Sequence, residues 1–77
     1  MTGLLYKIDS YDKRLTDNIE ASFENKYEKI YFYSKSFKEI SLNKGDYFFY
    51  SDNDLEINKR FQVISIITNN KIEARQA

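Results

Sequence analysis

The sequence predicts a mostly β fold, a small antiparallel barrel or sandwich formed by a single domain, residues 1–77. Three observations support this prediction. Residues 61–68, FQVISIIT, are apolar and β-branched, and the run is too short for a buried helix. Residues 29–34, KIYFYS, alternate between two faces, as a half-buried strand does. Asn and Gly at 43–46 and at 69–70 then supply the positive φ angles of tight turns.

Length and composition indicate a folded chain with a small core. Seventy-seven residues form one domain. The chain has no Cys, so the core depends on its seven Tyr, six Phe and nine Ile. Full burial of such a side chain contributes about 1.5–3 kcal/mol. This apolar content predicts a stable globular domain rather than a disordered one, about the size of an SH3 or OB domain.

The N-terminal third contains one plausible strand and one ambiguous segment. Residues 4–9, LLYKID, fit a first strand. In residues 11–27, apolar side chains recur every four positions, which favours a helix at about residues 11–26 and an α+β fold. However, Ile19, Ala21 and Phe23 alternate with polar residues, which favours a strand. We favour the strand, and therefore a barrel or sandwich of six or seven short strands.

The middle of the chain predicts a strand followed by a hairpin. In residues 29–35 one face carries Lys29, Tyr31, Tyr33 and Lys35, and the other carries Ile30 and Phe32. Residues 37–42, FKEISL, and 47–51, YFFYS, flank a turn at NKGD, which is typical of two paired strands. The stretch SDNDLEINKR, residues 51–60, is expected to be a solvated loop.

The C-terminal hairpin can be predicted down to its register. If Asn69 and Asn70 form a two-residue turn, Thr68 pairs with Lys71 and Ile67 with Ile72. Further along, Ser65 faces Ala74 and Val63 faces Gln76. The inner face would then consist of Phe61, Val63, Ile67, Ile72 and Ala74. Ile64 and Ile66 would point the other way and need a second layer to cover them.

Residue types argue against catalysis and against a cofactor or metal. The chain has no His and no Cys, which removes the common nucleophilic triads and most zinc sites. No Gly-rich phosphate-binding loop is present. Asp52, Asp54 and Glu56 alternate like the start of a calcium loop, but Ile57 and Val63 occupy the positions of its Gly and bidentate Glu. We predict a non-enzymatic protein without cofactor or bound metal.

The sequence contains no signal for membrane insertion or export. The longest apolar run, residues 63–67, is far too short to span a bilayer, and residues 1–9 lack a basic head followed by a long apolar stretch. We expect a soluble, cytoplasmic protein or a component of a particle assembled in the cytoplasm.

Tyrosine-rich surfaces predict binding to another protein. Seven Tyr exceed what a small core can bury with satisfied hydroxyls, and Tyr is enriched at interface hot spots. The expected partner is another protein or a second copy of the chain. The predicted contact residues are Lys29, Tyr31, Tyr33, Lys35, Lys38, Tyr47 and Tyr50, with a second, acidic patch at Asp52, Asp54 and Glu56.

Nucleic-acid binding is the alternative. Strand 29–35 could stack bases on Tyr31 and Tyr33 while Lys29, Lys35 and Lys38 follow the phosphates. A net charge of zero disfavours it.

A short chain rich in Lys, Asn, Ile and Tyr is also typical of phage and mobile-element proteins, which suggests a virion or tail component, or a stoichiometric inhibitor of a host protein.

Overall fold

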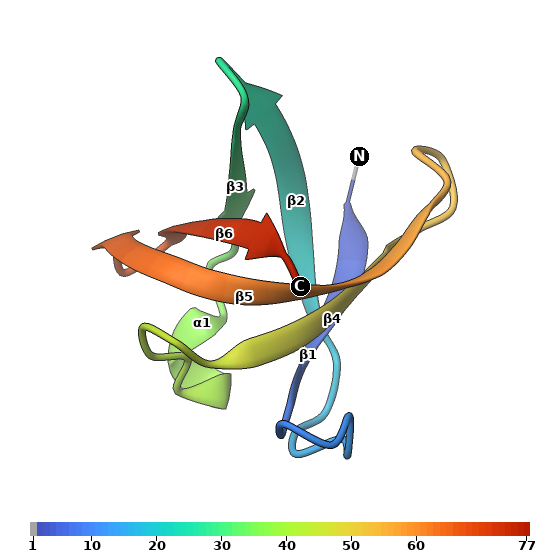
Figure 1. The fold of residues 1–77 in the computed structure, drawn as a ribbon, viewed down its shortest axis with the longest axis vertical. Helices are drawn as coiled ribbons and strands as arrows, with labels where there is room; N and C mark the ends of the chain where they lie inside the picture. Colours follow the sequence, from blue (N-terminus) through green and yellow to red (C-terminus); the bar gives the residue numbers. More distant parts are fainter. Residues whose placement is uncertain (1) are drawn as a thin grey trace.

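A computed structural model describes residues 2–77 as a closed antiparallel β-barrel with one short helix. The strands are β1 (Gly3–Ile8), β2 (Ile19–Lys26), β3 (Lys29–Tyr33), β4 (Tyr47–Asp52), β5 (Ile57–Thr68) and β6 (Lys71–Gln76). Around the barrel their order is β1-β2-β3-β6-β5-β4, and β4 pairs with β1 to close it. The predicted mostly β fold is therefore confirmed, as a barrel (Figure 1).

The ambiguous segment is a loop followed by a strand, not a helix. Ile19 and Ala21 on β2 are buried at 6% and 2% exposure, and Phe23 packs against the core, as the alternating pattern predicts. The apolar side chains that recur every four positions do not form one buried helix face, because the first of them, Tyr11, is 90% exposed. In the loop, the Asp9 carboxylate accepts hydrogen bonds from the backbone N–H groups of Tyr11 and Lys13 at 2.8 and 2.9 Å.

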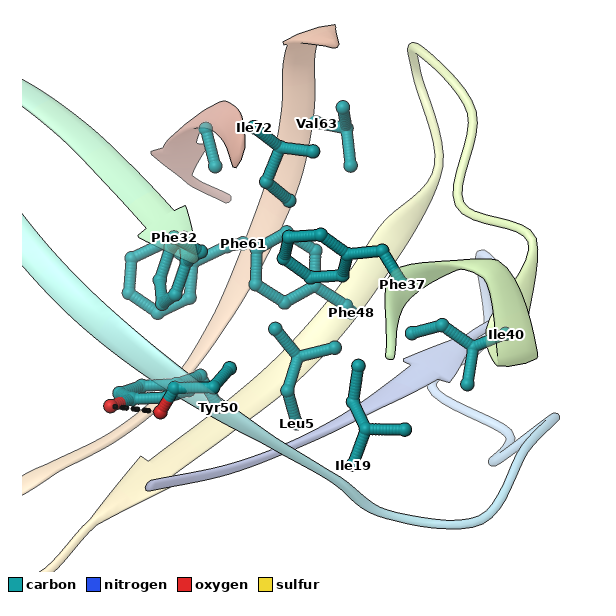
Figure 2. Close-up of a cluster of buried hydrophobic side chains, with 12 residues drawn as sticks. Leu5, Ile19, Phe32, Phe37, Ile40, Phe48, Tyr50, Phe61, Val63 and Ile72 are labelled. Atoms are coloured by element: carbon teal, nitrogen blue, oxygen red, sulfur yellow. Dashed lines mark hydrogen bonds between the residues drawn. The ribbon is translucent and has the colours of Figure 1, made fainter. Parts of the chain in front are cut away.

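Residues 37–42 do not form the expected strand. They contain a single helical turn, α1 (Phe37–Ile40), which ends at Ser41 in a left-handed conformation. Phe37 and Ile40 are three positions apart, so a strand would place them on opposite faces, whereas a helical turn places them on the same face. Both side chains are buried and close one end of the barrel (Figure 2). The need to cover this end favours the helical turn over the predicted hairpin.

The predicted loop at 51–60 is largely strand. Only Asn53–Glu56 form a turn, because β4 extends to Asp52 and β5 already starts at Ile57. With 12 residues, β5 pairs with β4 along its first half and with β6 along its second. Each half of β5 therefore pairs with a different strand. The β4–β5 hairpin extends past the end of β6 (Figure 1).

The last hairpin keeps its predicted turn but not its register. Thr68 pairs with Lys71 as expected, but Ile66 rather than Ile67 lies opposite Ile72. The register shifts twice, between Val63 and Ser65 and between Ile66 and Thr68. Such bulges insert an extra residue into one strand and increase its twist, which helps a long strand curve around a small barrel.

These bulges change which isoleucines are buried. Of the predicted inner face, Phe61, Val63, Ile72 and Ala74 are buried, whereas Ile67 is 46% exposed. Because Val63 now pairs with Ala74, and Ser65 with Glu73, the predicted pairs Val63–Gln76 and Ser65–Ala74 are also wrong. Ile66 lies near α1 at the end of the barrel and remains 45% exposed.

The centre of the barrel is an aromatic cluster around Phe32 (Figure 2). Its ring centroid lies 4.8–5.0 Å from those of Tyr50, Phe48 and Phe61, at edge-to-face angles. Phe23 packs against Phe32 from β2 at 5.5 Å. Edge-to-face contacts at these distances are favourable beyond the area they bury. The aromatics thus supply the burial that a small chain without disulfides needs.

Candidate protein-binding surface

The strongest candidate surface lies on the outer face of β3, around Tyr31 and Tyr33. Strand alternation directs Phe32 into the core, where it is fully buried, and leaves both tyrosines half-buried on the outside. Lys71 on β6 pairs with Tyr33 across the strands, and its Nζ lies 4.5 Å from the Tyr31 ring centroid and 5.3 Å from that of Tyr33. We call Tyr31, Tyr33 and Lys71 the tyrosine surface.

Neighbouring side chains hold the tyrosine surface in place. The Tyr33 hydroxyl donates a hydrogen bond of 3.1 Å to Glu24 Oε1 on β2. Interaction with Tyr33 raises the pKa of the Lys71 ammonium, and the charges of Tyr31 and Glu24 add to this shift. An open surface pocket of about 520 Å³ runs along this face and continues to the β2–β3 turn. Its lining consists of Glu24, Lys26, Tyr27, Lys29, Tyr31, Tyr33 and Lys71.

Carboxylates flank Tyr31 on both sides. Across the strands, Tyr31 pairs with Glu24 on β2 and with Glu73 on β6. Residues directly opposite each other project to the same face of the sheet. The row Glu24–Tyr31–Glu73 therefore places negative charge next to the ring, while Lys29 and Lys71 place positive charge above and below it. The surface is mixed in charge rather than basic.

The structure does not bring the other predicted contact residues to this surface. Lys35 is exposed in the segment after β3, and Lys38 is exposed on α1. Tyr47 lies on the outer face of β4, with the Arg60 guanidinium 4.4 Å from its ring centroid. Only Lys29 joins Tyr31 and Tyr33, because it lies on the same face of the same strand.

Tyr50 is not a surface residue, so its assignment as a contact residue is wrong. It has no solvent exposure, and it packs against Phe32 with 4.8 Å between ring centroids. Alternation along β4 directs Phe48 and Tyr50 inward and Tyr47 and Phe49 outward. The four consecutive aromatics of β4 therefore divide into two core residues and two outer residues.

The acidic patch is smaller than predicted. Asp52 is buried at 3% exposure, and its Oδ1 accepts hydrogen bonds from the backbone N–H groups of Asp54 and Leu55 at 2.9 and 3.2 Å. Its carboxylate thus stabilises the β4–β5 turn. Asp54 and Glu56 are exposed, and Glu56 has a φ of 55°. Two carboxylates of the three remain accessible to a partner.

Sequence reasoning missed a second aromatic surface. On the outer faces of β1 and β4, the rings of Tyr6 and Phe49 stack with 5.7 Å between centroids. The Arg14 guanidinium lies 4.5 Å from the Tyr6 centroid. Arg60 also forms an ion pair of 3.3 Å with Asp12. Alternation in LLYKID could have placed Tyr6 outside, but Arg14 comes from the loop after β1 and Arg60 from β5, and only the fold brings them close to these rings.

Comparisons with protein-family models, with curated proteins and with solved structures found no match. Within residues 2–77, no helix has the length and apolarity needed to cross a membrane. No group of three or more His, Cys, Asp or Glu side chains is placed to hold a metal ion in the part of the chain that the structure describes.

Proposed function

We propose that this chain is a non-enzymatic module that binds another protein through the tyrosine surface. The observation that carries the proposal is the pair of half-buried rings, Tyr31 and Tyr33, held side by side by Lys71. Tyrosines fixed by their neighbours lose little conformational entropy on binding, and they are enriched among residues that dominate interface energies. A virion or tail component and a host-protein inhibitor would both use a surface of this kind.

The mixed charge around Tyr31 favours a protein partner over nucleic acid. Base stacking requires the phosphates on either side of the base to pass close to the ring. Glu24 and Glu73, the cross-strand neighbours of Tyr31, would repel those phosphates. A protein surface can instead match both signs, because interfaces surround an aromatic centre with a polar rim. Nucleic-acid binding remains the alternative, and an experiment must distinguish it from protein binding.

Affinity capture with a matched pair of variants tests the proposal. The tagged wild-type chain should capture one dominant protein from a lysate of the organism that encodes it. Tyr31→Ala/Tyr33→Ala should weaken binding to that purified protein by about 30-fold or more, as hot-spot residues do. Tyr11→Ala is the control, because Tyr11 is 90% exposed in the loop between β1 and β2, away from the tyrosine surface.

Two results would contradict the proposal. One is unchanged affinity of a correctly folded Tyr31→Ala/Tyr33→Ala variant for the captured protein. The other is binding of single-stranded oligonucleotides that weakens with salt and is lost in the same variant, which would favour the nucleic-acid alternative. Circular dichroism of each variant before binding separates loss of the surface from loss of the fold.

A further inference from the structure

The β2–β3 hairpin extends beyond the closed part of the barrel. In the part of the chain that the structure describes, β1 pairs with β2 at residues 19–21, whereas β2 pairs with β3 from Ser22 to Lys26. Among residues 2–77, no strand lies along the other edge of residues 24–26. Figure 1 shows this hairpin projecting at the same end of the barrel as the β4–β5 hairpin. An uncovered strand edge offers backbone groups to a further strand.

Strand alternation determines which backbone groups this edge presents. A two-residue turn joins β2 to β3, with Lys26 opposite Lys29. Such a turn closes on a hydrogen-bonded pair, and hydrogen-bonded pairs then alternate with non-bonded ones. The backbone groups of Lys26 and Glu24 therefore face β3. Those of Asn25 face outward, so Asn25 is the centre of the free edge.

The hairpin also presents an exposed aromatic side chain at its tip. Tyr27 is 87% exposed, and Tyr27 and Glu28 form the turn with φ angles of 53° and 65°. Positive φ is unfavourable for residues other than Gly, and hairpin turns of this type are usually Asn-Gly. A large ring is thus displayed on a turn for which its residue type is poorly suited. Within the chain, the Lys26 ammonium lies 5.6 Å from the ring centroid, and most of the ring remains open to solvent.

Charges along the free edge match those of an identical strand running in the opposite direction. If two copies pair antiparallel about Asn25, Glu24 of each copy lies opposite Lys26 of the other. Pairing about Glu24 would oppose two carboxylates, and pairing about Lys26 would oppose two ammonium groups. Opposite charges across a strand pair are stabilising and like charges destabilising. The register about Asn25 is also the one that lets its outward backbone groups bond to those of the second Asn25.

From these features we infer that a second copy of this chain binds the free β2 edge, forming a two-fold dimer centred on Asn25. The same register places Tyr27 of each copy two positions from the centre, at the end of the paired edge, where the second chain would lie close to its exposed ring. Backbone pairing would supply affinity, and the charges would select the register. This dimer rests on the proposed role as a binding module and adds self-association to it.

Cysteine cross-linking of the purified protein tests the dimer. Because the chain has no Cys, Asn25→Cys introduces a single thiol whose counterpart lies directly opposite, with Cα atoms about 5.5 Å apart in a hydrogen-bonded pair. This separation suits a disulfide. Under mild oxidation most of the Asn25→Cys protein should become a covalent dimer. Lys29→Cys, which is also exposed but lies on the other strand of the hairpin, should not. Equal cross-linking of the two variants would overturn the inference.

Charge reversal supplies a second and independent measurement. Glu24→Lys places a lysine opposite Lys26 of the other copy at both ends of the interface. This repulsion should weaken the dimer about tenfold in sedimentation equilibrium. The double variant Glu24→Lys/Lys26→Glu restores both opposite-charge pairs and should bring affinity back to within about threefold of the wild type. Failure of this rescue would overturn the register.

The two proposals fail separately. A wild-type chain that is monomeric at high micromolar concentration, yet still captures a partner through Tyr31 and Tyr33, would overturn the dimer and leave the proposed function intact. The opposite result is a chain that cross-links at position 25 but binds its captured protein equally well after Tyr31→Ala/Tyr33→Ala. It would overturn the proposed function instead.

Discussion

The hydroxyl of Tyr50 donates a hydrogen bond of 3.1 Å to Asp52 Oδ2, and both side chains are buried in the barrel. The other carboxylate oxygen, Oδ1, accepts two backbone hydrogen bonds from the β4–β5 turn. The Tyr50 hydroxyl also lies 3.3 Å from the backbone oxygen of Ala21 on β2 (Figure 2). One buried hydroxyl thus links β2, β4 and the turn that starts β5.

Removing this hydroxyl should destabilise the protein. Tyr50→Phe leaves Asp52 Oδ2 buried without its donor, which costs about 1–3 kcal/mol of the free energy of unfolding. Tyr47→Phe is the matched control, because Tyr47 lies on the outer face of the same strand and is only partly buried. Urea denaturation measures both. Equal stability of the two variants would show that the Tyr50–Asp52 contact contributes little.

The same pair predicts a loss of stability at alkaline pH. Burial raises the pKa of Tyr50 from 10.0 to about 12, with the Asp52 carboxylate adding to the shift. The unfolded tyrosine loses its proton near pH 10, whereas the folded one retains it to about pH 12. The contribution to stability is therefore complete below pH 10 and falls as the pH rises from 10 to 12.

Comparison with Tyr50→Phe isolates this effect from the other tyrosines and lysines. The difference in free energy of unfolding between wild type and Tyr50→Phe should shrink steadily above pH 10. Urea denaturation at several pH values between about 8 and 11.5 would measure it, with about 0.1 M salt to hold screening constant. A difference that stays constant over that range would refute the assignment.

Gly3 is required by close packing and Gly45 by backbone conformation. A Cβ atom on Gly3 would lie 2.6 Å from Tyr50 Cζ and would also clash with the backbone oxygen of Ser51. We expect Gly3→Ala to cost about 1–3 kcal/mol, as overpacking does. Gly45 has a φ of 92° with open space around it, so Gly45→Ala should cost about 1–2 kcal/mol through backbone strain alone.

A double-mutant cycle distinguishes these two causes. The Cβ atom that Gly3→Ala introduces would lie 2.7 Å from the Tyr50 hydroxyl oxygen, so removing that oxygen with Tyr50→Phe should relieve part of the clash. The two substitutions should therefore be less destabilising together than the sum of the single changes. Gly45→Ala and Tyr50→Phe should add independently. Additivity in both cycles would contradict the packing account of Gly3.

Phe32 should be the most sensitive core position. Its ring contacts those of Phe23, Phe48, Tyr50 and Phe61, so Phe32→Ala should cost about 3–5 kcal/mol. A domain of this size has a total stability of about 4–12 kcal/mol, so the variant should lose at least about a quarter of it and melt at a clearly lower temperature. Phe49→Ala, on the outer face of β4, should remain folded. A Phe32→Ala variant that melts at the wild-type temperature would contradict the central role of this ring.

Local patterns predicted most of the strands correctly. Alternation placed Phe32 inside and Tyr31 and Tyr33 outside, because successive side chains of any strand project to opposite faces. The same rule predicted β2, and the Asn69–Asn70 turn followed from the backbone freedom of Asn. The tyrosine surface was therefore half visible in the sequence. Lys71 was missing from it, because a residue so far beyond Tyr33 in the chain becomes its neighbour only when β3 and β6 pair.

Alternation alone could not say which aromatics of β4 are buried. Tyr47 and Phe49 are as apolar as Phe48 and Tyr50, so both assignments of the two faces are equally compatible with the sequence. The strands that pair with β4 decide which two aromatics are buried. Leu5 lies opposite Tyr50 on one side, and Phe61 lies opposite Phe48 on the other. Both partners are core residues, and they orient the strand between them.

By itself, the sequence determined the mostly β class, the strand faces of β2 and β3, and the last turn, since these depend on local backbone preferences and on the two-residue period. Closing the barrel decided the rest. Closure required Phe37 and Ile40 to cover one end from a helical turn, and β5 to curve through two bulges that leave Ile67 outside. Among residues 2–77, it also left the edge of β2 at residues 24–26 without a neighbouring strand. These features depend on contacts between distant segments, which no local pattern encodes.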